Sequence, residues 1–364
     1  MSSTPEATVP DVDRQQTGAL DEALDRLQHT GPEWHGRLSN HGPMVVEAMV
    51  RNGHSDEVSG WVDWYAAKLD ALPHASERIR PEQWREALGD PTRIGDWLEF
   101  FEIEMKQQPW EDVLIHWWPR LLPGLAASAT HSVIRLGHAV QANRTHPASE
   151  TATREIGQSL AYWAARWLPV PASAKQTGNL DPSSALESLP HMGERDFGFA
   201  DCLAELATDV RWPSASATLR SIDDPVTAQQ QLFDLVTAAT LRYQTHGHGD
   251  EIMLVHAATA PNAVARILPS LPHRMWAASV RTAWAASAAI TLIYNPEDSR
   301  VDTTDSAPGK GSRSAEDTFA QAVEHGDEHV IKFTDAALDV FTRTSNPSAL
   351  AAAQHAITII ERDS

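Results

Sequence analysis

The sequence predicts an all-α protein, and three observations support this fold class. Apolar residues recur every three or four positions through most of the 364 residues. The alternation of apolar and polar residues that is typical of strands is nearly absent. Gly, Pro and Asn gather between the periodic segments, where helices end. No repeat and no domain boundary is visible, so we expect a single large multi-helix domain over residues 17–364.

The predicted helices follow one another with few interruptions. A polar, Pro-containing tail over residues 1–16 is expected to be disordered, and helical spacing begins near Ala19. The helical segments are expected at 19–28, 45–53, 96–105, 113–118, 122–142, 150–168, 199–210, 228–244, 251–260, 274–294, 329–341 and 347–360. A Pro-, Ser- and Gly-rich break separates two of them at 169–195, and a flexible insert is expected near 296–316.

Composition excludes several classes of partner. The chain has 49 acidic against 29 basic residues, a formal net charge of −20, and such a chain repels nucleic acid and anionic membranes. It has no apolar run of membrane-spanning length, and its first residues lack the apolar region of a secretory signal. A lone cysteine, Cys202, cannot form an internal disulfide. We therefore expect a cytoplasmic protein, and the oligomeric state stays open, a homodimer included.

Several short motifs carry little weight. The stretch APGKGS at 307–312 lacks the strand and helix that flank a phosphate-binding loop, and no G-x-G-x-x-G or nucleophile elbow is present. His246, His248 and Asp250 lie close together in a Gly-containing stretch. This trio is more typical of a solvent-exposed turn than of a metal site.

Four histidines fall where surface histidines are not expected: His41, His131, His256 and His329. His41 precedes a helix that has Pro43 in its first turn, and at such a position the helix dipole favours a neutral ring. His131 and His256 interrupt buried apolar runs, and His329 lies at the edge of an apolar helix face. Each one alone is more often a hydrogen-bonded core histidine than a ligand. Periodicity does not reveal whether the four converge.

Two further residues share a helix face with His131, namely Arg135 and His138. Lys332 follows His329 by three residues and, on its helical wheel, turns towards acidic neighbours. Glu328 and Lys332 have the i, i+4 spacing of a solvated ion pair. The local pattern thus predicts a surface lysine.

Four stretches, taken together, favour a functional interpretation of these histidines and of Lys332 over a structural one: NHGPMVVEAM, WEDVLIHWWPRLLPGLAASATHSVIRLGHAV, LVHAATAPNAVARILPSLP and HVIKFTDAAL. In this order they resemble the questin oxidase-like family, over about residues 39–338. The resemblance implies a helical enzyme that oxidises and opens a ring of an anthraquinone-type polyketide, in the manner first described as Baeyer–Villiger oxidation. It also implies a non-haem iron(II) held by His41, His131, His256, His329 and a carboxylated Lys332. His138 stands where the family often has an aromatic residue, so we expect it outside the ligand set.

This ligand set is chemically coherent. A protonated lysine cannot bind a metal, whereas a lysine carbamate is an anion with two oxygens. Four neutral imidazoles and one carbamate leave an iron(II) centre with a net charge near +1. Five protein ligands leave about one octahedral position open, so the substrate should bind beside the metal without chelating it.

The resulting hypothesis is an iron(II)- and O2-dependent monooxygenase or dioxygenase that cleaves a small-molecule aromatic polyketide. Arg135 is a candidate catalytic residue that polarises a substrate carbonyl, and His138 a candidate that supports the ligands. Candidate walls for a flat substrate are Trp97, Trp117, Trp118 and Trp284, although such residues more often fill a core. The alternatives are an NADPH-dependent Baeyer–Villiger enzyme, a metal-dependent hydrolase and a non-catalytic helical scaffold.

Overall fold

The structure is a computed structural model that describes residues 11–171, 176–193, 198–222, 224–300 and 314–362, and these residues are mostly helical. The α-helices are α1 (Asp11–Gln28), α2 (Gly42–Arg51), α3 (Ser55–Ala66), α4 (Trp84–Ala87), α5 (Ile94–Gln107), α6 (Trp110–Leu121), α7 (His131–Thr145), α8 (Glu150–Ala165), α9 (Pro182–Glu187), α10 (Phe199–Leu206), α11 (Trp212–Ser216), α12 (Pro225–His246), α13 (Met253–Ile267), α14 (Trp276–Tyr294), α15 (Ala315–His325), α16 (Glu328–Thr344) and α17 (Ser348–Ile359). Short 3-10 helices are η1 (Pro91–Arg93), η2 (Leu122–Gly124), η3 (Gly247–Gly249), η4 (Leu268–Ser270) and η5 (His273–Met275).

The predicted all-α class is confirmed. Within the described ranges the sheet content is one antiparallel pair, β1 (Glu33–Trp34) and β2 (Leu38–Ser39). α1 begins at Asp11, five residues before the predicted end of the tail at Gln16, and residues 1–10 lie outside the described part. The predicted insert falls between α14 and α15, and its residues 301–313 are likewise outside it. α9 lies within the predicted break at 169–195.

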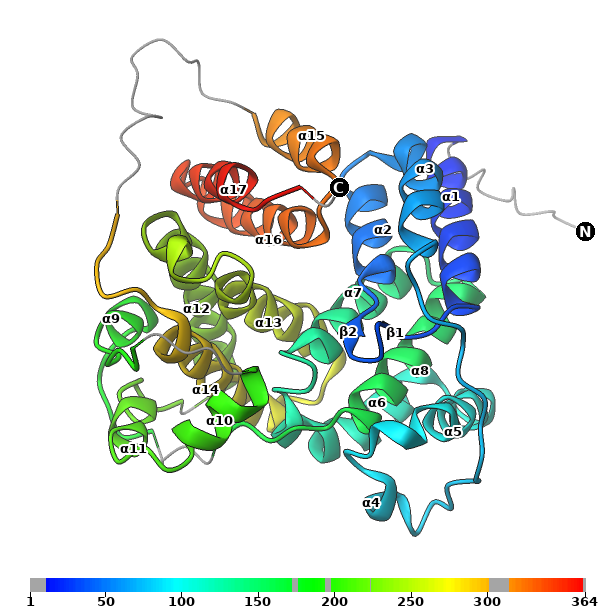
Figure 1. The fold of residues 1–364 in the computed structure, drawn as a ribbon, viewed down its shortest axis with the longest axis horizontal. Coiled ribbons are helices and arrows are strands. Elements are labelled where there is room, and N and C mark those ends of the chain that lie inside the picture. Colours follow the sequence, from blue (N-terminus) through cyan, green and yellow to red (C-terminus); the bar gives the residue numbers. More distant parts are fainter. Residues whose placement is uncertain (1–10, 172–175, 194–197, 223, 301–313, 363–364) are drawn as a thin grey trace, which may run out of the picture.

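Helices from both ends of the chain share one core. Figure 1 shows α1, α2 and α3 together, with α16 and α17 to the left of α2 and with α7 and α13 below. α13 packs against α7, α12, α14 and α16, and α16 also contacts α2. One apolar cluster accordingly runs from Leu20 of α1 to Ile360 after α17. Segments far apart in sequence are thereby fixed around the centre of the molecule.

Local sequence determines where these helices begin. Asp327 accepts hydrogen bonds from the backbone N–H groups of His329 and Val330 and so caps α16. α2 has Pro43 in its first turn, where a missing N–H costs nothing. α7 and α13 approach closely because residue 137 is glycine: a Cβ at Gly137 would lie 2.6 Å from the Cβ of Ala263. Among the helices that the structure describes, none has the length and apolar character needed to cross a bilayer.

Candidate metal centre

Four helices begin at the same place, and each contributes a histidine from its first turn. His41 is the N-cap of α2, and His131 is the first residue of α7. His256 is the fourth residue of α13, and His329 is the second residue of α16. The helix starts therefore bring together residues that are up to 288 positions apart in the sequence.

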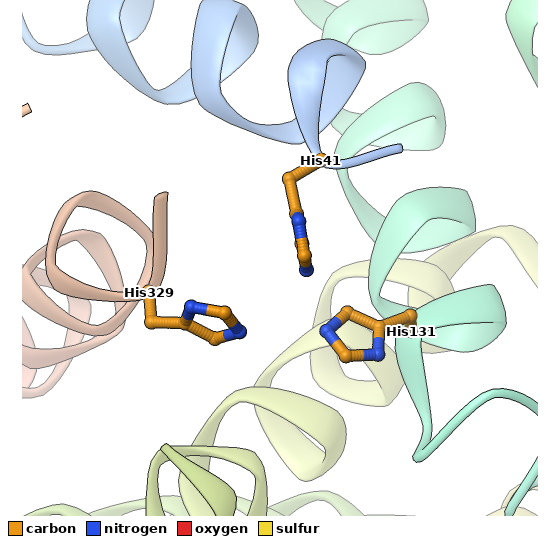
Figure 2. A group of neighbouring side chains, drawn as sticks. All are labelled: His41, His131 and His329. Carbon is orange, nitrogen blue, oxygen red and sulfur yellow. The ribbon is translucent and has the colours of Figure 1, made fainter. Parts of the chain in front are cut away.

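The four rings form a closed circuit. Ring centroids are 4.5 Å apart between His41 and His131, and 4.4 Å apart between His131 and His256. The circuit closes through His329, at 5.5 Å from His256 and 4.8 Å from His41. The separation across the circuit, from His131 to His329, is 5.9 Å. Figure 2 shows His41, His131 and His329 pointing into a common space from α2, α7 and α16.

These separations fit imidazoles around one metal ion. A metal–nitrogen bond of about 2.1 Å puts each ring centroid about 3.2 Å from the ion, so neighbouring rings at right angles lie about 4.6 Å apart and opposite rings about 6.4 Å. Three sides of the observed circuit lie near 4.6 Å, the side between His256 and His329 is longer at 5.5 Å, and the diagonal is 5.9 Å. Nitrogens of His41, His131 and His329 also lie within 4.8 Å of one another.

The pair formed by His131 and His256 gives the clearest electrostatic indication. Nδ1 of His131 lies 2.5 Å from the carbonyl oxygen of Ser128, and Nδ1 of His256 lies 2.9 Å from that of Ile252. A carbonyl oxygen only accepts, so both Nδ1 atoms carry the proton and both Nε2 atoms present a lone pair. The two Nε2 atoms are 2.9 Å apart, close to the spacing of two ligands bound at right angles. Two lone pairs at this distance repel each other unless a positive charge lies between them.

His41 is oriented in the same way by a carboxylate. Its Nδ1 lies 3.0 Å from Oε1 of Glu328, and its Nε2 is buried without a hydrogen-bond partner among the described residues. Oε2 of Glu328 lies 3.7 Å from Nζ of Lys68. A carboxylate that binds the outer nitrogen of a metal-ligating histidine fixes the tautomer and makes the ligand more basic. His329 has Nδ1 3.7 Å from Oδ1 of Asp327, beyond hydrogen-bond distance.

Lys332 lies inside the protein, so the surface position that its local pattern predicts is wrong. Its side chain is 1% exposed, and Nζ has no hydrogen-bond partner among the described residues. Burial lowers the pKa of Lys332 to about 7, although Glu328 and Asp327 act in the opposite direction. A large share of this amine is therefore neutral at physiological pH. Glu328 pairs with His41 and Lys68 instead of forming a solvated pair with Lys332.

The environment favours the neutral form of three of the imidazoles, those of His41, His131 and His256. Burial first, and then the nearby charge of Lys332, lowers the pKa of His41 and of His256 well below the ordinary range. Burial and His256 do the same for the pKa of His131. The four helix N-termini add partial positive charge, which disfavours imidazolium and favours an anion at the centre. Protonation of the rings of His131 and His256 is thus disfavoured.

The backbone before His131 is strained. Ser128, Ala129 and Thr130 all have positive φ angles, of 49°, 52° and 70°. For residues with a Cβ this left-handed conformation costs about 1 kcal/mol or more each. The turn brings the carbonyl oxygen of Ser128 onto Nδ1 of His131. The strained residues 128–130 therefore orient the ring of His131, a candidate ligand.

Arg135 and His138 are buried next to other partners. The guanidinium of Arg135 donates to Glu155 of α8 at 2.5 and 3.0 Å and to Gln158 at 3.3 Å, and its Nη1 has no partner among the described residues. Nδ1 of His138 lies 2.5 Å from Oε2 of Glu47. Glu47, His138 and Asp335 form a second group of potential ligands, further along the same helices.

Other candidates from the sequence lie elsewhere. His246 ends α12, with Nδ1 2.7 Å from the hydroxyl of Thr245, and His248 lies 3.9 Å from Asp298. In the described part of the molecule, no contact joins either ring to the four-histidine circuit. The four candidate tryptophans are all buried in the core: Trp97, Trp117, Trp118 and Trp284.

Comparison with known families gives a match over most of the chain. The family model described as Questin oxidase-like matches residues 51–337, more than three quarters of the chain. The chain belongs to the questin oxidase-like family. No curated protein matches it. Membership of a family named for an oxidase indicates an oxidoreductase. Of the residues around the centre of this questin oxidase-like protein, all lie within the matched range except His41.

The sequence did not indicate two residues that lie next to the four histidines, Glu328 and Lys68. Helical spacing pairs Glu328 only with Lys332, because spacing compares residues within one helix and His41 lies on another. Lys68 gave no signal, since a lysine beside Trp64 and Tyr65 is unremarkable in sequence. In the structure its Nζ lies 4.5–4.8 Å from the ring centroids of Trp34, Trp64 and Tyr65.

Proposed function

We propose that this protein is an iron(II)- and O2-dependent oxygenase that opens a ring of a polycyclic, anthraquinone-like polyketide. The observation that carries the proposal is the pair of facing Nε2 lone pairs on His131 and His256. His41 and His329 complete the set of imidazoles, and family membership supports oxidative chemistry. When bound, the iron would supply one-electron redox chemistry and the activation of O2.

Lys332 is proposed to be the anionic ligand, as a carbamate. The neutral amine attacks CO2, a C–N bond forms, and one proton leaves to solvent. Burial supplies the neutral amine, because it lowers the pKa of Lys332 to about 7. Four helix N-termini and a metal dication favour the resulting negative charge. An unmodified, protonated Lys332 beside a dication would be repelled by several kcal/mol at 4 Å and an effective dielectric constant near 20.

Other residues of the chain have supporting roles in this proposal. Glu328 holds the proton on Nδ1 of His41 and thereby aims Nε2 at the centre. Nη1 of Arg135 is proposed to donate to a substrate oxygen, since its other nitrogens are held by Glu155 and Gln158. The side chain of His329 is 12% exposed, so we expect the substrate to approach the centre from the side of His329.

Metal analysis combined with an oxygen-uptake assay tests the proposal. Purified protein should contain about one iron per chain, and uptake of O2 with a hydroxyanthraquinone should proceed without NADPH once iron is kept reduced. His246→Ala is a matched control that removes a histidine outside the circuit and should leave the iron content unchanged. Strict dependence on NADPH in a metal-free protein would identify a Baeyer–Villiger enzyme instead. Absence of both metal and oxygen uptake would favour a helical scaffold.

A further inference from the structure

A second polar cluster lies one to three helical turns beyond the histidines, on the same four helices. We call this cluster the ion-pair network, and it consists of Glu47, Arg51, His138, Arg266, Asp335 and Asp339. α2, α7, α13 and α16 each contribute at least one member. Charged groups are buried in proteins at a large desolvation cost, so a network that ties together these particular helices calls for an explanation.

Arg266 of α13 is the most connected member. Its Nη2 donates to Oδ2 of Asp335 at 2.5 Å and to Oδ2 of Asp339 at 2.6 Å, both on α16. Its Nη1 lies 3.3 Å from both ring nitrogens of His138 on α7. The rigid fork of one guanidinium thus joins the helices that carry His131, His256 and His329.

Asp335 and His138 connect this group to α2. Oδ1 of Asp335 accepts from the guanidinium of Arg51 and from Nδ2 of Asn52 at 2.9 Å. His138 lies 2.5 Å from Glu47, which also pairs with Arg51 at 3.4 Å. Asp335 is 0% exposed and lies one turn after Lys332 on α16. The ion-pair network therefore connects all four helices that carry candidate ligands, at positions further along each helix than the histidines.

The network is a poor metal site, although four of its members have carboxylate or imidazole side chains and three of these, Glu47, His138 and Asp335, lie close together. Both oxygens of Asp335 already accept from guanidinium groups, one from Arg266 and one from Arg51. Oε2 of Glu47 binds the ring of His138, and Oε1 lies next to Arg51. A dication among these carboxylates would stand beside two arginines and would displace charge-assisted hydrogen bonds.

We propose that the ion-pair network positions the metal centre: it fixes the relative placement of α2, α7, α13 and α16, so that the four histidines hold ligand geometry before a metal binds. Its members are positioning residues that do not touch the metal or the substrate. This inference rests on the proposed function, because it presupposes that the histidine circuit binds a metal.

Cobalt(II) binding to the full chain tests this role. Cobalt(II) replaces iron(II) in air, and its ligand-field absorption reports the geometry of its ligands. Metal-free wild type, Asp335→Asn and Asp339→Asn are titrated in bicarbonate buffer, and melting temperatures are measured with chelator. Asp339 is partly exposed, so its isosteric replacement provides a milder variant should Asp335→Asn fail to fold.

Asp96→Asn is the matched control. Asp96 is a buried carboxylate paired with Arg93, and it accepts from the backbone N–H groups of Ser76 and Glu77 at 2.6 and 2.9 Å. It lies on α5, which carries none of the proposed ligands. The same chemical change is thus made at a similar structural site away from the four helices.

The expected result separates positioning from general stability. Asp335→Asn should raise the Kd for cobalt(II) about 10-fold or more and change the ligand-field spectrum, with a smaller effect for Asp339→Asn. Asp96→Asn should lower the melting temperature while leaving the Kd and the spectrum as in wild type. The proposal is overturned if the network variants bind cobalt(II) like wild type, or if wild type binds two cobalt ions and Asp335→Asn binds one. Wild-type protein that binds no cobalt at all would contradict the proposed function itself.

Discussion

Replacing Lys332 with methionine should stabilise the metal-free protein at neutral pH, even though it removes a proposed ligand. Nζ of Lys332 is buried without a hydrogen-bond partner among the described residues, and burial lowers its pKa from 10.5 to about 7. At a pH between these two pKa values, Lys332 is protonated in the unfolded chain and largely neutral in the folded one, so the unfolded chain binds more protons. The free energy of unfolding of the wild type therefore rises with pH across this window, and the gain is lost as the pH falls towards 7.

The size of the effect follows from the same values. Each pKa unit between the unfolded and the folded value changes the free energy of unfolding by about 1.36 kcal/mol. The full pKa difference therefore corresponds to at most about 5 kcal/mol. Between pH 7 and pH 9 the wild type should gain about 2 kcal/mol from this group alone. Methionine has a similar length and no charge, so Lys332→Met should lack this gain. The advantage of the variant should be largest at or below pH 7 and shrink towards pH 9.

Urea unfolding at pH 6, 7, 8 and 9, followed by circular dichroism, measures this difference. Buffers contain a chelator and are depleted of CO2, so that neither metal nor carbamate traps the amine. Lys106→Met, at a solvent-exposed position, controls for the removal of a lysine. Parallel pH profiles for the wild type and Lys332→Met would refute the reasoning, since they would mean that the amine is not desolvated in the folded protein.

Four further predictions concern metal content and affinity. His256→Ala should lose most bound metal, whereas His246→Ala should retain it, as measured by elemental analysis. Lys332→Ala should abolish metal binding and Lys332→Glu should retain part of it, while added bicarbonate should speed the rebinding of iron(II) by metal-free wild type. Glu328→Gln should raise the metal Kd about 10-fold in calorimetric titration, because the outer partner of a ligating histidine is lost. Gly137→Ala should also weaken binding, because its new methyl group pushes α7 away from α13, and an unchanged Kd would show that this contact can relax.

Much of the fold was predictable from sequence because helical periodicity is local. The pattern around His329 predicts a helix whose inner face holds Val330, Phe333, Ala337 and Phe341. The first three are buried in α16, and Phe341 is partly buried. The brief pairing of β1 with β2 was not predicted, since two residues per strand give no alternation to detect.

The candidate site could be predicted only in part. Spacing identified histidines in buried helical runs, but their convergence depends on tertiary packing that no single helix encodes. Only the order of the four stretches, through the family resemblance, suggested that they act together. Their roles as metal ligands stay predictions. Lys332 shows the limit of local reasoning, because α16 packs against α2, α12, α13, α15 and α17, and little of its circumference is left for solvent.

The placement of the histidines in first helical turns links the fold to the proposed chemistry. Side chains on a helix lean towards its N-terminus, so a residue in the first turn projects beyond the helix end, into the space where several helices meet. His41, His131, His256 and His329 all use this geometry. The same helix ends carry partial positive charge, which would oppose a dication held by neutral ligands alone. In the proposed function an anionic ligand resolves this conflict, and Lys332, a buried residue in the second turn of α16, is the residue proposed to become that ligand.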